Sequence, residues 1–313
     1  MKLVTFSIGS EQRIGALSPG GVVDLAQAVA RYLAQESRGV SQSRAARLVP
    51  GDMVQLLSQG DEVLNICRQA LASREGAADG TQDILPMTAV RVLAPVTRPG
   101  KILGVGRNYG AHAKEAGLSP SEQKQPRIFA KFSSSVIGPD AGIPKPKAVE
   151  KLDYETELAV VIGKRARNVS EAEAGSVIAG YTIVNDVSAR ELQLDVNPPQ
   201  TSFAKSMDGF CPMGPCLVTP DELPDPGRLD IKCWLNGELV QDGNTADMIF
   251  SVPYTISYLS RFLTLEPGDV LATGTPPGVG VFRKPPRFLR PGDHLRMDIS
   301  GIGSLTNVVV EGL

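Results

Sequence analysis

Two glutamates stand two positions apart in the stretch LDYETELAVVIG, directly before an apolar run. Residues i and i+2 of a β-strand point to the same face, so Glu155 and Glu157 would lie side by side at the margin of a core. Asp186 ends another expected strand, AGYTIVNDVSA. Carboxylates at strand ends supply oxygen ligands only, which suit Mg²⁺ or Mn²⁺. The three residues are therefore candidate metal ligands, and glutamates in water at an exposed strand end are the simpler alternative.

A histidine and a glutamate in the stretch RNYGAHAKEAG form a second candidate pair. His112 and Glu115 are three positions apart and would share one face of a helical turn. A carboxylate that holds an imidazole makes a plausible general base for the activation of water. The surrounding glycines and small residues indicate a loop that can move. The alternative is a surface helix on which the pair is incidental.

Two further segments say little when each is taken alone. Lys205, in SFAKSMDGF, is an isolated cation that is most simply interpreted as a solvated lysine. The stretch TGTPPGVG is a loop rich in glycine and proline that follows an expected strand. His294 follows a Pro-Gly-Asp turn, and we expect it to be structural.

Composition and motifs argue against several classes of partner. The net charge of −2 gives no electrostatic reason to expect nucleic acid or an anionic membrane. No run approaches the roughly 18 apolar residues of a membrane span. The stretch KILGVGRNYG spaces its glycines as GxGxxxG, whereas a dinucleotide site needs GxGxxG, and the chain has no GK[ST] of a P-loop. We expect no nucleic-acid, nucleotide or membrane partner.

Cysteine usage and the N-terminus bear on the compartment. The four cysteines form no CxxC pair and no zinc-like cluster, which suits reduced thiols better than a disulfide framework. The segment MKLVTFSIGSEQR lacks the apolar stretch of a signal peptide. These features predict a cytoplasmic protein, with an organelle matrix as the alternative.

The first ninety residues differ from the remainder of the chain. A short strand (LVTFSIG) precedes two helical segments, and SREGAADGTQD then has the composition of a linker. From residue 90 onward the chain consists mostly of short expected strands. Two helices interrupt them: one begins at Ser170, where Ser170 and Glu173 form a capping box, and the other is VPYTISYLSRFLTL.

This order of elements predicts a β-rich α+β fold. We place the boundary between residues 75 and 96, which gives a small N-terminal α/β domain with its linker over residues 1–90 and a catalytic domain over residues 91–313.

Taken together, the segments resemble the fumarylacetoacetate hydrolase family, and most closely its domain-containing protein 2 subgroup with the bacterial relatives of that subgroup. The match covers roughly residues 95 to 310 in the family's order. The stretches that carry it are KILGVGRNYGAHAKE, IFAKFSSSVIGP, LDYETELAVVIGK, GYTIVNDVSARELQ, AKSMDGFCPMGP, LNGELVQDGNTADMIF and LEPGDVLATGTPPGVGVFRKPPRFLRPGD. The resemblance implies a mixed β-sandwich roll that commonly forms a homodimer.

The resemblance also implies roles for individual residues. In the family, an ExE pair and a later aspartate hold Mg²⁺ or Mn²⁺, and Glu155, Glu157 and Asp186 match them. The family's histidine–glutamate pair on a mobile lid matches His112 and Glu115.

A second group of residues would contact the substrate. The family's lysine in a GKSFD-like segment matches Lys205, although the segment here reads AKSMD. Arg190, Gln193 and Thr275 match positions that contact substrate oxygens in relatives, and Lys131 is a further candidate. The implied ligand is a small 2-oxo acid.

The implied chemistry is stabilisation of an enolate by the metal and Lys205. If His112 and Glu115 activate water, the result is hydrolysis of a C–C bond in an acylpyruvate-like 2,4-dioxo acid, which is our first expectation. The alternative is decarboxylation or keto–enol tautomerisation of oxaloacetate at the same site. Isomerase or dehydratase chemistry on 2-oxo acids and a non-catalytic metal-binding scaffold are less favoured, and the fold does not choose among these reactions.

Overall fold

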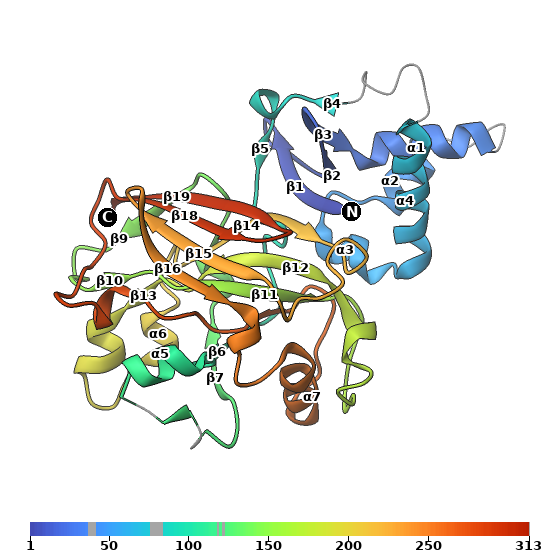
Figure 1. The fold of residues 1–313 in the computed structure, drawn as a ribbon. Coiled ribbons are helices and arrows are strands. Elements are labelled where there is room, and N and C mark those ends of the chain that lie inside the picture. Colours follow the sequence, from blue (N-terminus) through green and yellow to red (C-terminus); the bar gives the residue numbers. More distant parts are fainter. Residues whose placement is uncertain (37–41, 76–83, 118, 121–122, 313) are drawn as a thin grey trace.

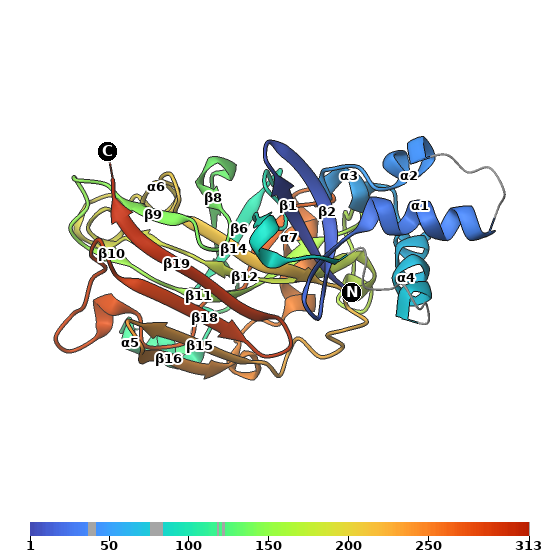
Figure 2. The same ribbon diagram turned by 90° about the horizontal axis from the view of Figure 1, so that it is seen from above.

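A long mixed sheet runs through the molecule (Figures 1 and 2). The computed structural model describes residues 1–36, 42–75, 84–117, 119–120 and 123–312. The twelve-stranded sheet runs in the order β4 (Ile84–Leu85), β3 (Gly21–Asp24), β2 (Glu11–Ser18), β1 (Lys2–Ile8), β14 (Cys211–Val218), β12 (Ile178–Asn185), β11 (Thr156–Ile162), β17 (Val270–Ala272), β6 (Ile102–Gly106) and β7 (Arg127–Lys131). Off this path, β5 (Arg91–Val92) pairs with β1, and β8 (Val136–Ile137) pairs with β14.

A second sheet packs against the middle of the first and closes a sandwich (Figure 2). Its five strands are β16 (Glu238–Asn244), β15 (Asp230–Leu235), β18 (His294–Ile299), β19 (Gly303–Glu311) and β9 (Gly142–Lys145). A small third sheet joins β10 (Leu152–Asp153) to β13 (Ser188–Ala189). One apolar cluster contains residues of both large sheets, and it includes Leu158, Val160 and Ile162 of β11. The expected β-rich α+β sandwich is confirmed.

Strand β11 is buried along its whole length, which explains its unbroken apolar run. Its side chains alternate between the two faces of the sheet, and each face is covered. Leu158 and Val160 pack into the sandwich core, whereas Ala159 and Val161 pack on the opposite side with residues of the N-terminal region. The two glutamates of the opening stretch therefore stand at the start of a strand that is buried at every residue.

The helices lie at the periphery of the sheets (Figure 1). They are α1 (Leu25–Glu36), α2 (Gln42–Leu48), α3 (Met53–Ser58), α4 (Asp61–Glu75), α5 (Gly110–Glu115), α6 (Thr201–Ala204) and α7 (Val252–Phe262). Helix α7 confirms the second expected helix: the Ser251 hydroxyl accepts a hydrogen bond from the Tyr254 N–H, and Val252, Ile256 and Leu259 are buried. Among the described residues, no helix combines the length and hydropathy needed to cross a membrane.

The α-helix expected to start at Ser170 does not form. The capping box is present, because the Ser170 hydroxyl lies 2.7 Å from a carboxylate oxygen of Glu173. It leads into a turn and the short 3₁₀ helix η4 (Ala174–Val177), since strand β12 begins at Ile178.

The N-terminal region joins the main sheet directly. Strand β1 pairs antiparallel with β14, and Leu3 lies opposite Leu217. A second apolar cluster combines residues of α1 and α4 with buried residues of β11, β14 and β17. Residues 76–83 of the expected linker lie outside the described residues, and the division into domains 1–90 and 91–313 stays a prediction.

Candidate active site

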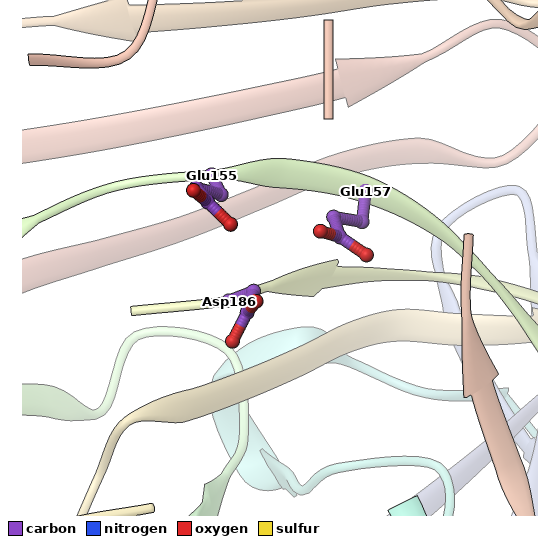
Figure 3. Close-up of side chains that lie close together, drawn as sticks. All are labelled: Glu155, Glu157 and Asp186. Atoms are coloured by element: carbon purple, nitrogen blue, oxygen red, sulfur yellow. The ribbon is translucent and has the colours of Figure 1, made fainter. Parts of the chain in front are cut away.

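Three carboxylates converge where β10 leads into β11, beside the end of β12 (Figure 3). Thr156 pairs with Asn185, so Glu155, which precedes Thr156, lies opposite Asp186, which follows Asn185. The Asp186 N–H donates to the Glu155 carbonyl at 2.9 Å. Each of Glu155, Glu157 and Asp186 is buried, and their ligand oxygens lie within 4.8 Å of one another. The sheet thus brings together the three side chains that the sequence nominated as metal ligands.

Two buried lysines face these carboxylates. The Lys205 ammonium donates to Glu155 at 2.8 Å, to Asp186 at 2.5 Å and to the Ser188 hydroxyl at 2.7 Å. Lys131 donates to the other Asp186 oxygen at 2.7 Å and to the Lys205 carbonyl. Lys205, which follows α6, is therefore part of the site. Lys131 binds Asp186 but does not line the pocket.

Arg190 is held on all sides of its guanidinium. It donates to Asp153 at 2.8 Å, to Gln193 at 2.7 Å and to Glu155 at 2.7 Å. Asp153 also accepts the N–H groups of Gly280 and Val281. Arg190 is thus a fixed part of the wall, and its contact with Gln193 uses the amide oxygen, so the amide N–H₂ group of Gln193 can donate to a ligand.

Burial and neighbouring charges shift the pKa values of the two glutamates in opposite directions. Burial alone raises the pKa of Glu155, but Lys205, Arg190 and His112 outweigh it and hold that pKa well below its usual value. Burial raises the pKa of Glu157 well above its usual value, and the neighbouring charges of Asp186 and Glu155 add to the increase. The Glu157 carboxylate accepts only the Gly274 N–H, at 2.8 Å, and no cation of the described residues pairs with it.

This arrangement fits a hard divalent cation. Glu157 is a buried carboxylate that faces two others and lines the pocket without a cationic partner. Oxygen donors alone favour Mg²⁺ or Mn²⁺ over softer metals. In the described network, Lys131, Lys205 and Arg190 face four carboxylates, those of the triad and Asp153, and a dication would offset the remaining repulsion.

His112 and Glu115 lie on the short helix α5 at the pocket. The His112 Nδ1 atom is 3.4 Å from a Glu115 oxygen, and the imidazole packs against the Phe282 ring with 5.9 Å between centroids. Glu115 also accepts the Gly278 N–H at 3.2 Å. Because Nδ1 faces the carboxylate, Nε2 is the nitrogen left for a ligand, as a general base requires.

The loop TGTPPGVG wraps close to these residues because two glycines permit it. Gly274 and Gly278 have φ values of +98° and +105°, and a Cβ atom at Gly278 would lie 2.1 Å from the Val240 carbonyl oxygen. The buried Thr275 hydroxyl accepts from the Gln241 amide at 2.8 Å, so its own hydrogen can be donated to a ligand.

A single pocket unites most of the predicted residues. Of the ten, all except Glu115, Asp186 and Lys131 line a cavity of about 50 Å³, which is room for a few waters or a short acid. His294 lies outside this pocket, at the exposed start of β18.

Sequence reasoning missed several residues of the same pocket. Arg107, Arg127, Phe129 and Phe282 also line it. Arg107 stands in the RNY segment next to the predicted lid, but its type and spacing gave no signal of a role. Phe129 contributes a ring face 4.9 Å from the Lys205 ammonium, which is cation–π geometry.

Comparison with known proteins identifies the architecture around this site. Residues 101–310 match the family described as Fumarylacetoacetate (FAA) hydrolase C-terminal, which is well over half of the chain. The chain belongs to the fumarylacetoacetate hydrolase family. The resemblance that the sequence motifs indicated is therefore confirmed.

Individual relatives within the family differ in their named reactions. The human protein named oxaloacetate tautomerase FAHD2A, mitochondrial, is 45% identical over 84% of this chain and 81% of its own length. A fumarylacetoacetate hydrolase structure from Exiguobacterium antarcticum has a TM-score of 0.78 and 34% identity, with 99% of each chain covered. A maleylpyruvate hydrolase structure from Sphingobium sp. SYK-6, in complex with manganese(II) and pyruvate, has a TM-score of 0.75 and 30% identity over 100% of both chains. Members of the family are enzymes, and their reactions are not all alike.

Proposed function

We propose that this chain is a divalent-metal-dependent tautomerase that interconverts the keto and enol forms of oxaloacetate. The observation that carries the proposal is a pocket lined by Glu155, Glu157, Lys205 and His112, with Asp186 completing the carboxylate triad beside it. The relative named oxaloacetate tautomerase supports the same substrate.

The residues of the pocket can orient a 2-oxo acid without large movements. Glu155, Glu157 and Asp186 would hold Mg²⁺ or Mn²⁺, as the manganese and pyruvate in the maleylpyruvate hydrolase relative support. The dication, when bound, would polarise the 2-oxo group and offset negative charge as the enol forms. The Thr275 hydroxyl and the Gln193 amide have donors free to bind the substrate's oxygens.

The proton transfer is assigned to His112. In the keto form, Nε2 of neutral His112 takes a proton from C3, and the electron pair of that C–H bond forms the C2–C3 double bond of the enolate. Glu115 stabilises the imidazolium through Nδ1, and Lys205 stabilises the negative charge on the C2 oxygen. The imidazolium then gives the proton to that oxygen, which yields the enol with no net gain or loss of atoms.

Hydrolysis of an acylpyruvate is the second candidate function. The His112–Glu115 pair is complete, and it could activate water for attack on a second carbonyl. The maleylpyruvate hydrolase relative supports this reaction. It ranks second because the relative named oxaloacetate tautomerase is 45% identical to this chain, whereas the maleylpyruvate hydrolase is 30% identical.

An activity panel separates the two candidates. Purified protein with Mg²⁺ or Mn²⁺ is given oxaloacetate, and the decay of the enol absorbance is compared with that of a protein-free control. Acetylpyruvate and fumarylpyruvate are assayed in parallel, with product analysis by NMR. We expect accelerated tautomerisation that chelation of the metal removes, without release of pyruvate. C–C cleavage of either dioxo acid at a higher kcat/KM would make hydrolysis the primary reaction.

The assembly and the compartment are part of the proposal. A homodimer is proposed from the family resemblance, and sedimentation measurements test it. The human relative is named as mitochondrial, which supports a matrix location beside the expected cytoplasmic one. The described cysteines are all free, as a reducing compartment would require.

A further inference from the structure

Two arginines at the pocket have no ionic partner within the part of the chain that the structure describes. Arg107 and Arg127 line the same cavity as Glu155 and Lys205. No carboxylate of the described residues forms an ion pair with either, although Arg190, Lys131 and Lys205 are all paired. Half-buried Arg107 and exposed Arg127 stand nearer to solvent than the buried floor. The pocket therefore has a floor whose cations are all paired with carboxylates and a mouth whose arginines are not.

The backbone places both guanidinium groups at this mouth. Gly106 of β6 lies opposite Arg127 of β7, and a Cβ at Gly106 would touch the Arg127 side-chain stem at 3.6 Å. Arg107 follows directly with φ of +61°, a conformation that is uncommon for a residue other than glycine and that recurs at functional sites.

Asn108 fixes this unusual turn in place. Its side chain donates to the carbonyls of Phe250 and Thr273 at 3.0 and 2.7 Å and accepts the Phe250 N–H at 2.8 Å. Burial lowers the pKa of Arg107, and the nearby positive charges of Arg127 and Arg190 lower it further, while the charge of Glu155 opposes them in part. The protein thus holds like charges together at a rigid position, which a bound anion would relieve.

We propose that Arg107 and Arg127 bind the second carboxylate of a short 2-oxo dicarboxylate, and that they make the pocket selective for dicarboxylic over monocarboxylic 2-oxo acids. The planar fork of an arginine matches the two oxygens of a carboxylate. The inference rests on the proposed function, because the floor must first hold the 2-oxo acid end. Arg107 and Arg127 line the same cavity as these floor residues and would face the other end of such an acid.

Calorimetry with two matched ligands tests this selectivity without turnover. Difluoro-oxaloacetate has two carboxylates and no hydrogen on C3 to transfer, and 3,3-difluoro-2-oxobutanoate has the same C3 fluorines but a methyl group in place of the second carboxylate. Each is titrated into Mn²⁺-supplemented wild-type protein, Arg107→Gln and Arg127→Gln. Arg290→Gln is the control, because Arg290 is an exposed arginine that does not line the pocket.

The wild type should bind the dicarboxylate at least about 10-fold more tightly than 3,3-difluoro-2-oxobutanoate, and each pocket variant should lose about 10- to 100-fold for the dicarboxylate alone. Arg290→Gln should match the wild type. Equal weakening of both ligands, or no change, in both pocket variants would overturn the role of the arginines and leave the proposed function standing. A wild type that binds neither ligand would overturn the proposed function, and this inference with it.

Discussion

The cationic side chains at the floor of the pocket are paired with carboxylates, whereas those described at its mouth are not. At the floor, the ammonium and guanidinium groups of Lys205, Lys131 and Arg190 each contact at least one carboxylate, and all are buried. At the mouth, Arg107 and Arg127 have no carboxylate partner among the described residues and are at least partly open to water. The floor is a nearly complete electrostatic network, whereas the mouth lacks its counter-ion.

This difference assigns the two regions different tasks. Buried charges that are paired and hydrogen-bonded are rigid, and their oxygens stay where a metal and a developing negative charge require them. Unpaired arginines near solvent cost less to maintain and can select among ligands. We therefore expect substitutions in the floor to damage metal binding, turnover and stability together, and substitutions in the mouth to change ligand choice.

The largest effect is expected from loss of a metal ligand. Glu155→Ala or Asp186→Ala should reduce Mg²⁺ affinity by more than the roughly 10- to 100-fold that removal of an outer-shell partner costs, and activity should fall to background. Calorimetric titration with Mg²⁺ and Mn²⁺ measures this, and Glu115→Gln serves as the control that keeps the metal. Unchanged affinity in both floor variants would remove the triad from the metal site.

Lys205→Met should give the next largest effect. It leaves Glu155 and Asp186 without their shared ammonium, so we expect turnover to fall by about 10²–10³-fold and the free energy of unfolding by about 3–5 kcal/mol. Urea denaturation and steady-state assays measure the two losses. The added change Glu155→Gln should restore part of the stability but not the turnover. Wild-type turnover in a folded Lys205→Met protein would contradict its role.

His112→Ala should slow the reaction while leaving the floor intact. A lost general base costs about 10²–10⁴-fold in rate. Metal affinity should stay within about twofold of the wild type, because His112 is not one of the three ligands. If the variant keeps the full tautomerisation rate, the proton is transferred by another group.

The smallest effect concerns two buried thiols that are not part of the pocket lining. Burial raises the pKa of Cys67 and of Cys233 to about 12. Their unfolded counterparts ionise near 9, so the unfolded state releases protons first and stability should decline as pH rises above about 9. Native protein at pH 8 should react slowly with a thiol reagent and rapidly after denaturation. Fast reaction of native Cys67 would show that the N-terminal core opens readily.

The triad was predictable because strand geometry fixes it. Spacing of two residues put Glu155 and Glu157 on one face, and the antiparallel pairing of β11 with β12 then brought Asp186 beside them. Helix α7 was also predictable from the sequence, because its capping serine and the spacing of its apolar residues lie within one segment. In both cases the contacts that decide the structure lie within one segment or between two adjacent strands.

The parts that escaped prediction depend on distant partners. The role of Asp153 as the anchor of Arg190 requires the N–H groups of Gly280 and Val281, more than a hundred residues away. The left-handed turn at Arg107 depends on carbonyls that Asn108 finds at Phe250 and Thr273. No pattern of residue types in one stretch reveals such contacts.

The pairing of β1 with β14 has a consequence for how the molecule behaves in concentrated solution. Without β1, the backbone groups that β14 directs toward it would be exposed along an apolar strand. Such a strand recruits strands from other copies and promotes aggregation. The N-terminal segment therefore shields the strand beside β12 from intermolecular pairing, a protective task that is independent of any catalytic contribution.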